Sequence, residues 1–267
     1  MTVYKKSLGQ HILQNIGAAR RIVESLGIER GDSVLEIGPG RGVLTGIMAE
    51  LPIQLIAVEV DQRFVVELRE RFKSADNMTI INESILDINI RSIVGDNRCK
   101  LVGNLPYNLS SQILKKAFEN HDLFPLAVFT VQKEVADRMT AHLGSRDYSS
   151  LTVFTETYSR SEKLFTLKPG SFYPPPKVSS AVVRLTFRDS IPIAGERREA
   201  FSRFVQSIFA HRRKTILNSL TFATSLSRDR LESVLENSEI DDSVRPQNVS
   251  LDRFVSLFNA LDEVKDA

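Results

Sequence analysis

The run Asn104-Leu-Pro-Tyr107 contains residue types that could hold an aromatic amine. The carbonyl oxygen of Asn104 could accept one amine hydrogen, and a backbone carbonyl near Leu105 or Pro106 could accept the other, since proline lacks an N–H but keeps its C=O. Two such acceptors favour a pyramidal nitrogen whose lone pair points at an electrophilic methyl group, and Tyr107 could stack on the ring. The alternative is an ordinary turn, because Asn and Pro are common at strand ends.

A glycine-rich loop, Glu36-Ile-Gly-Pro-Gly-Arg-Gly42, follows an apolar strand-like run and opens a helical pattern. Its spacing is Gly-x-Gly-x-Gly, which differs from the dinucleotide fingerprint, and it lacks the Lys-Ser/Thr of a P-loop. Glu59 ends the next strand-like run, where a carboxylate can accept hydrogen bonds from both ribose hydroxyls and would repel a 2′-phosphate. These features favour S-adenosylmethionine as the ligand. A generic strand-to-helix turn and an NAD-dependent oxidoreductase remain as alternatives.

The elements that must position these residues alternate between strands and helices, which predicts a doubly wound α/β domain. Helices are expected at 12–26, 43–51 and 64–72. Strands are expected at 33–38, 55–59, 78–82, 100–103 and 126–131, with late β-rich segments at 151–158 and 181–187. From about residue 190 the apolar pattern becomes helical. We therefore expect a catalytic domain over 1–188 and a small helical domain over 189–267, the alternative being a last layer of one domain.

Composition excludes several classes of protein. The chain has 267 residues, of which 42% are hydrophobic and 25% charged, so it can bury a core and is not disordered. A single cysteine, Cys99, excludes a disulfide framework and a cysteine-based zinc site, and it fits a cytoplasmic protein. No apolar run is long enough for a membrane span, and the four histidines show no metal-ligand spacing. We expect a monomer with no metal and no membrane contact.

Several motifs together resemble the 16S rRNA adenine N6,N6-dimethyltransferase family over nearly the whole chain. The resemblance rests on Lys6–Leu13, Glu36–Gly42, Val58–Asp61, Gly103–Asn108, Val131–Val135, Phe172–Val178 and Phe209–Thr215. It implies a Rossmann-like class I S-adenosylmethionine-dependent methyltransferase fold with a small helical C-terminal domain. It also implies dimethylation of two adjacent adenosines in the 3′-terminal hairpin of 16S rRNA within immature 30S particles.

The resemblance assigns roles by position. The candidate catalytic residues are Asn104, Pro106 and Tyr107. The cofactor would contact Gln10, His11, Leu13, Gly38, Gly40, Glu59, Val60, Ser84, Ile85 and Asn104, and the segment 1–13 would be a flexible cover over the cofactor. One position departs from the family: Ser84 stands where an Asp usually bonds the cofactor's adenine amino group. Either Ser84 makes a weaker contact, or Glu83 or Asp87 substitutes for the Asp.

Two further features suggest RNA binding. The cluster Arg212-Arg213-Lys214 could contact phosphates, although it could also be a solvated helix face. Phe172, in a stiff Phe-Tyr-Pro-Pro-Pro loop, could form the second face of a base sandwich, or the loop could be a spacer. Alternatives to the 16S assignment are a 23S rRNA adenine methyltransferase of the macrolide-resistance type and an RNA-binding assembly checkpoint whose catalysis is secondary.

Overall fold

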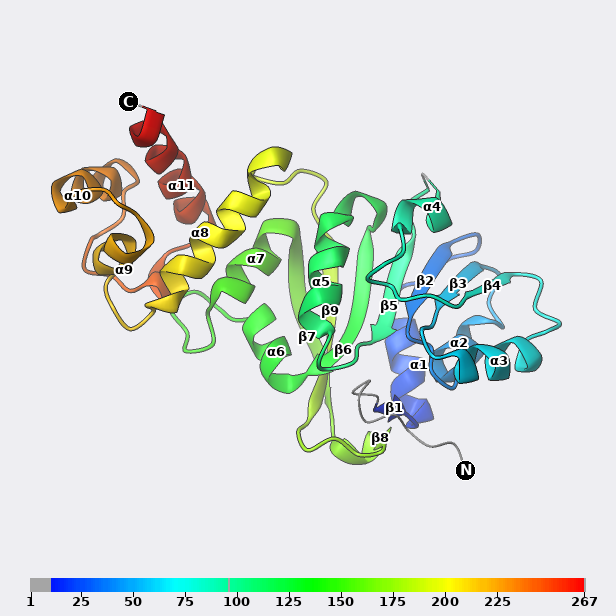
Figure 1. Cartoon of the computed structure of the whole chain (residues 1–267). Helices are drawn as coiled ribbons and strands as arrows, with labels where there is room; N and C mark the ends of the chain where they lie inside the picture. Colours follow the sequence, from blue (N-terminus) through cyan, green and yellow to red (C-terminus); the bar gives the residue numbers. More distant parts are fainter. Residues whose placement is uncertain (1–10, 96, 267) are drawn as a thin grey trace. The chain divides into compact units, whose positions relative to one another are not determined.

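A seven-stranded sheet with the order β4-β3-β2-β5-β6-β9-β7 organises the first part of the chain in the computed structural model, which describes residues 11–95 and 97–266 (Figure 1). The strands from β4 to β6 run parallel, and β9 pairs antiparallel with β6. The bounds of the strands are β2 Ser33–Ile37, β3 Gln54–Val58, β4 Met78–Ile81, β5 Lys100–Asn104, β6 Leu126–Gln132, β7 Ser159–Leu167 and β9 Ser180–Phe187. The predicted α/β class is confirmed.

Helices connect the parallel strands and cover both faces of the sheet. On one face, α1 and α2 contribute Ile22 and Met48 to a cluster with Val182 of β9. On the other face, Phe118 of α5 meets Phe187 of β9 with ring centroids 6.1 Å apart. Alternate residues of a strand point to opposite faces, so the odd spacing of Val182 and Phe187 places them on different sides. The helices are α1 Ile16–Glu24, α2 Val43–Met48, α3 Gln62–Arg71, α4 Ile90–Val94, α5 Ser110–Glu119 and α6 Lys133–Met139.

A second, two-stranded sheet joins the start of the described chain to a distant loop. Strand β1 (Ile12–Leu13) pairs antiparallel with β8 (Phe172–Tyr173), although more than 150 residues separate them in the sequence. The expectation of a helix over 12–26 is therefore wrong at its start. The helix α1 begins only at Ile16, because the side chain of Asn15 accepts a hydrogen bond from the amide of Ala18 at 2.9 Å and caps it.

The chain divides into two compact units. The first comprises the described residues up to Ala136 together with Arg160–Asp189, and the second comprises Asp137–Ser159 and Ser190 onward. The sequence placed 137–159 with the catalytic domain, whereas here this segment shares its core with the C-terminal helices: Tyr148 and Val153 belong to the same buried cluster as Phe254. Tyr148 also donates a hydrogen bond to the carbonyl of Val249 at 3.2 Å.

The second unit consists of helices. They are α7 Ser150–Tyr158, α8 Arg198–Ala210, α9 Ile216–Ala223, α10 Arg228–Asn237 and α11 Leu251–Asp266. The prediction of a β-rich segment at 151–158 is wrong. The β-branched residues Thr152, Val153, Thr155 and Thr157 are buried in α7. The helix starts with a capping box in which the amide of Ser149 donates to the hydroxyl of Thr152 at 2.9 Å. This cap and the tertiary packing outweigh the β-propensity of the run.

Short 3-10 turns complete the described chain, and their bounds are η2 His121–Leu123, η3 Pro169–Ser171, η4 Gly195–Arg197 and η5 Pro246–Asn248. Within the described residues, none of the helices has the length and apolar character needed to cross a bilayer.

Candidate active site

The glycine loop between β2 and α2 forms the floor of a pocket. Gly38, Gly40 and Gly42 all have positive φ, at 64°, 56° and 74°. A Cβ added at Gly42 would lie 2.6 Å from Cδ2 of Leu68, so this glycine is needed for packing. A Cβ at Gly38 would meet nothing within 4 Å, although Gly38 lines the pocket. The backbone there is open to a ligand that approaches closely.

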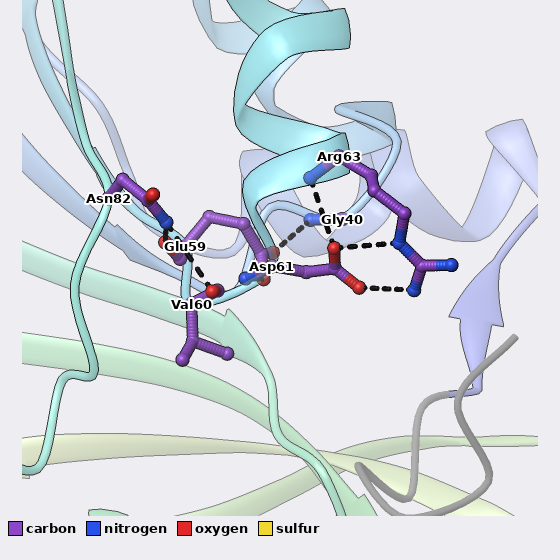
Figure 2. A network of polar contacts seen from close by, with 6 residues as sticks. All are labelled: Gly40, Glu59, Val60, Asp61, Arg63 and Asn82. Atoms are coloured by element: carbon purple, nitrogen blue, oxygen red, sulfur yellow. Dashed lines mark hydrogen bonds and ion pairs between the residues drawn. The ribbon is translucent and has the colours of Figure 1, made fainter.

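Glu59 directly follows β3, and its carboxylate is held by backbone amides (Figure 2). One oxygen accepts from the amide of Gly40 and the other from the amide of Asp61, each at 2.9 Å. Burial raises the pKa of this carboxyl, and the two amide hydrogen bonds work against that rise. Each carboxylate oxygen has two lone pairs, so both oxygens keep acceptor capacity for a ligand's hydroxyl groups.

Asn82 holds the backbone around Glu59 in place. Its side-chain amide donates to the carbonyl of Glu59 at 2.9 Å and to that of Val60 at 3.4 Å (Figure 2). Val60 lines the pocket and is 53% exposed, so its apolar side chain is open to a ligand. These two hydrogen bonds, from the residue after β4 to the residues after β3, therefore fix the backbone that carries the Glu59 carboxylate and the apolar Val60 beside it.

A second carboxyl, Glu36, lies in the pocket wall and is almost fully buried. The hydroxyl of Thr45 donates to Oε2 of Glu36 at 2.7 Å. Burial, assisted by repulsion from Glu59, raises the pKa of Glu36 to about 8 against the opposing Thr45 bond. Glu36 is therefore mostly protonated near neutral pH. The sequence showed this residue only as the start of the glycine loop.

Asn104 ends β5, and its side chain is oriented by a long-range hydrogen bond. Its Nδ2 donates to the carbonyl of His11 at 2.7 Å. Because that carbonyl can only accept, the amide assignment is fixed and Oδ1 is left as the available acceptor. Asn104 lines the pocket, so this oxygen belongs to the lining carboxamide that we predicted would meet an amine.

Two rings flank Asn104. The hydroxyl of Tyr107 lies 2.6 Å from the hydroxyl of Ser180, which fixes the phenol in the pocket wall. The ring of His11 lies 5.2 Å from that of Tyr107 at 36°. Nδ1 of His11 donates to the carbonyl of Pro174 at 2.7 Å, which ties the β1 segment to the proline loop. Sequence spacing gave no sign of this bridge.

The structure brings nearly all the predicted catalytic and cofactor-binding residues to this one pocket. Those that line it are His11, Leu13, Gly38, Gly40, Glu59, Val60, Ser84, Ile85, Asn104, Pro106 and Tyr107. Gln10 lies outside the described residues. Sequence reasoning missed further apolar lining residues, among them Ile12, Val43 and Phe64, which carry no motif signal.

The position expected to hold an Asp has a structural task of its own. The Ser84 hydroxyl accepts a hydrogen bond from the amide of Leu86 at 3.2 Å and so stabilises the turn after β4. Glu83 lines the pocket, whereas Asp87 is not among its lining residues. Of the two substitutes considered from the sequence, Glu83 is the one that the structure places at the pocket.

The residues expected to bind RNA lie elsewhere. Phe172 is 3% exposed, packs in the core with Leu13 and does not line the pocket in this conformation, whereas its neighbour Tyr173 is 49% exposed. In the second unit, Arg212 and the two basic residues after it are exposed.

The remaining candidate groups are inert. The Cys99 thiol is buried, and burial raises its pKa to about 12, so it is not a nucleophile. No three metal-ligating side chains gather within 11–95 and 97–266.

Solved structures define the class of this fold. A 23S rRNA methyltransferase, ErmE, superposes with a TM-score of 0.73 at 27% identity, covering 94% of this chain and 99% of that one. A dimethyladenosine transferase from Plasmodium falciparum gives a TM-score of 0.80 at 26% identity, covering 95% and 98%. Together with the glycine loop and the carboxylate after β3, these neighbours make the fold that of a class I S-adenosylmethionine-dependent methyltransferase.

Sequence relatives make the assignment more specific. The family described as "Ribosomal RNA adenine dimethylase" matches residues 1–263, and the chain belongs to it. Proteins named ribosomal RNA small subunit methyltransferase A are similar along the whole chain. The one from Koribacter versatilis is 37% identical, covering 96% of this chain and 94% of the relative, and the one from Desulforapulum autotrophicum is 39% identical, covering 96% and 92%. The family predicted from the motifs is confirmed.

Proposed function

We propose that this protein dimethylates the N6 amino groups of two adjacent adenosines in the 3′-terminal hairpin of 16S rRNA, acting as a monomer on immature 30S particles. Membership of the ribosomal RNA adenine dimethylase family supports the reaction, and the names of the relatives support the small subunit. The observation that carries the proposal is the oriented carboxamide of Asn104, whose nitrogen is bound to His11 and whose oxygen stays available in the pocket.

The residues present fit S-adenosylmethionine, which supplies an electrophilic methyl group when bound. Gly38 has no side chain, so the cofactor can approach its backbone closely. Glu59 provides a preorganised acceptor for ribose hydroxyls. Val60 and Ile85 provide apolar walls for a planar base. The neutral, buried Glu36 keeps the charge of the pocket low without removing an acceptor.

The target amine would be held by two oxygens that the chain positions. Oδ1 of Asn104 is one acceptor. The carbonyl of Pro106 already accepts from the amide of Leu109 at 3.0 Å, whereas no described group donates to the carbonyl of Leu105. Leu105 is therefore the better second acceptor. Two acceptors on the amine hydrogens make the nitrogen more nucleophilic before attack, and the departing proton leaves only after the new N–C bond forms, so no strong base is needed.

Aromatic contact would hold the target base out of its RNA stack. Tyr107 presents a ring whose hydroxyl is anchored to Ser180, and His11 lies beside it. Orientation of this kind replaces acid–base chemistry as the main source of rate enhancement. A neutral carboxamide also suits the second methylation, because Asn104 can still accept from the one hydrogen of a monomethylated amine.

The decisive experiment is methyl incorporation into immature 30S particles, with 23S rRNA as the competing substrate and mapping of every modified base. We expect two dimethylated adenosines, both in 16S rRNA. Asn104→Ala should lower the rate by roughly a hundredfold or more, since one positioned acceptor is worth about that much. Gln112→Ala, which removes an exposed carboxamide from α5, is the matched control.

Three results would contradict the proposal. Modification of 23S rRNA instead would favour the macrolide-resistance type of enzyme, and failure to bind S-adenosylmethionine in calorimetry would revive the oxidoreductase hypothesis. Full activity of Asn104→Ala would remove the proposed role of the carboxamide. If Asn104→Ala loses methylation but still binds immature particles, catalysis and a checkpoint role in assembly coexist.

A further inference from the structure

An exposed aromatic ring lies on the second unit, on α9 close to the turn that follows α8. Phe222 is 63% exposed, more than any other large hydrophobic side chain in the described ranges. The imidazole of His211, the residue that follows α8, stacks on Phe222 with ring centroids 4.3 Å apart and 23° between the planes. The two rings form a flat surface that the fold itself does not need for its core.

Exposed cations follow His211 directly. Arg212 donates to the carbonyl of Arg146 at 2.9 Å, so it is partly engaged within the unit. Arg213 and Lys214 are exposed, and neither has a described partner. The turn that carries them is ordered, because the amide of Lys214 donates to the carbonyl of His211 at 2.8 Å. Their charges are therefore held close to the ring pair while remaining available to a ligand.

A single exposed phenylalanine is ordinary on a protein surface, but the surroundings of Phe222 are not. A flat apolar surface beside two unpaired cations complements a polyanion whose flat apolar groups are accessible. Single-stranded RNA has this chemistry, because its phosphates are bound by cations and its bases stack on aromatic rings. A paired duplex offers the same phosphates, but its bases are stacked inside.

We propose that Phe222, supported by His211, stacks on an unpaired base of the RNA substrate, next to the phosphates that Arg213 and Lys214 are expected from the sequence to bind. This site rests on the proposed function, since it supposes an RNA substrate. It is a binding contact separate from the methyl-transfer pocket and has no part in the chemistry. It requires that the bound RNA region include at least one nucleotide outside a helix.

The test measures binding of the full chain to two RNAs with the same number of phosphates, one a single strand without pairing and the other a blunt-ended duplex of two shorter strands. Phe222→Ala should weaken binding of the single strand by roughly 5- to 150-fold, the value of one base–aromatic stack, and leave the paired RNA within about twofold. Phe222→Tyr should retain the affinity because the ring is kept. Val66→Ala, which truncates an exposed side chain on α3, is the apolar control.

Salt dependence separates the ring from the charges. Arg213→Ala should reduce the slope of log affinity against log salt by about 0.7 for the single strand, because one phosphate contact is lost. Phe222→Ala should leave that slope unchanged, since stacking releases no counterion. A changed slope for Phe222→Ala would show that the substitution disturbs the basic turn instead of removing a stacking contact.

Two further results would overturn the proposal. Unchanged affinity of Phe222→Ala for both RNAs would mean that the ring serves another contact, such as a protein, and an equal loss for both RNAs would mean a structural role. The outcome is separable from that of the proposed function. If the wild type methylates 16S rRNA while Phe222→Ala binds normally, only this inference fails. If Phe222→Ala shows the predicted loss while the wild type methylates no 16S adenosine, only the proposed function fails.

Discussion

Replacing Glu36 by glutamine should change how the stability of the first unit depends on pH. The pKa of this buried carboxyl is about 8 in the folded chain against 4.5 for an unperturbed one. The fold therefore favours the protonated form. The stability that the protonated carboxyl provides is fully present below about pH 4.5 and is lost as the pH rises toward about 8. The reason is that the unfolded chain releases this proton above about pH 4.5, whereas the folded chain holds it until about pH 8.

The size of the effect follows from the width of this pH window. Each pH unit between the two pKa values is worth about 1.4 kcal/mol, so the parent loses roughly 4 kcal/mol relative to Glu36→Gln between about pH 5 and about pH 8. Glutamine never ionises and keeps an oxygen that can accept from the hydroxyl of Thr45. The variant should therefore become increasingly more stable than the parent as the pH rises.

Amide hydrogen exchange over residues 33–48 reports on β2 and α2 directly and avoids any contribution from the second unit. Parent and variant are compared at each pH, so intrinsic exchange rates cancel. Glu50→Gln, which changes an exposed carboxyl just beyond α2, is the matched control. A stability difference that stays constant from about pH 5 to about pH 8 would refute the reasoning and would mean that Glu36 is ionised in the fold.

Three other substitutions test separate parts of the structure. Gly42→Ala should destabilise the first unit by roughly 2–4 kcal/mol in thermal unfolding, because the new Cβ would lie 2.6 Å from Cδ2 of Leu68 and the residue has a positive φ. An unchanged midpoint of unfolding would contradict this packing. Glu59→Gln should weaken binding of S-adenosylmethionine by roughly 10- to 100-fold in calorimetry. The reason is that a carboxamide has only one oxygen, which cannot accept from both backbone amides and also from a ligand. Equal affinity would place the ribose elsewhere. Tyr148→Phe should cost the second unit about 1–2 kcal/mol in urea, as the buried carbonyl of Val249 loses its donor, and a neutral effect would argue against that bond.

The pocket could be predicted from the sequence because its polar residues and glycines lie within short, recognisable motifs. Parallel strands end at one edge of the sheet, so residues that follow β2, β3 and β5 must converge there once the α/β alternation is recognised. The glycine loop, Glu59 and Asn104 can each be identified from their residue types and from their positions at the ends of apolar, strand-like segments. The family motifs pointed to the same place.

Other features could not be predicted because they depend on contacts between distant segments. The bond from Asn104 to the carbonyl of His11 spans 93 residues and sets which atom of the carboxamide is available. The pairing of β1 with β8 replaced the first turn of an expected helix with a strand. No periodicity within a short window carries information about such partners.

The sequence by itself determined the α/β class, the family and the glycines and polar residues that carry the pocket's motifs, since these follow from strand order, turn chemistry and residue type. Only the tertiary structure decided that burial raises the pKa of Glu36, that Phe172 is buried and that residues 137–159 share a core with the C-terminal helices. The physical reason is that burial and desolvation are properties of the whole packed chain. The type of a residue and its sequence neighbours show which chemistry it can perform, whereas its packed surroundings determine its charge, its exposure and its partners.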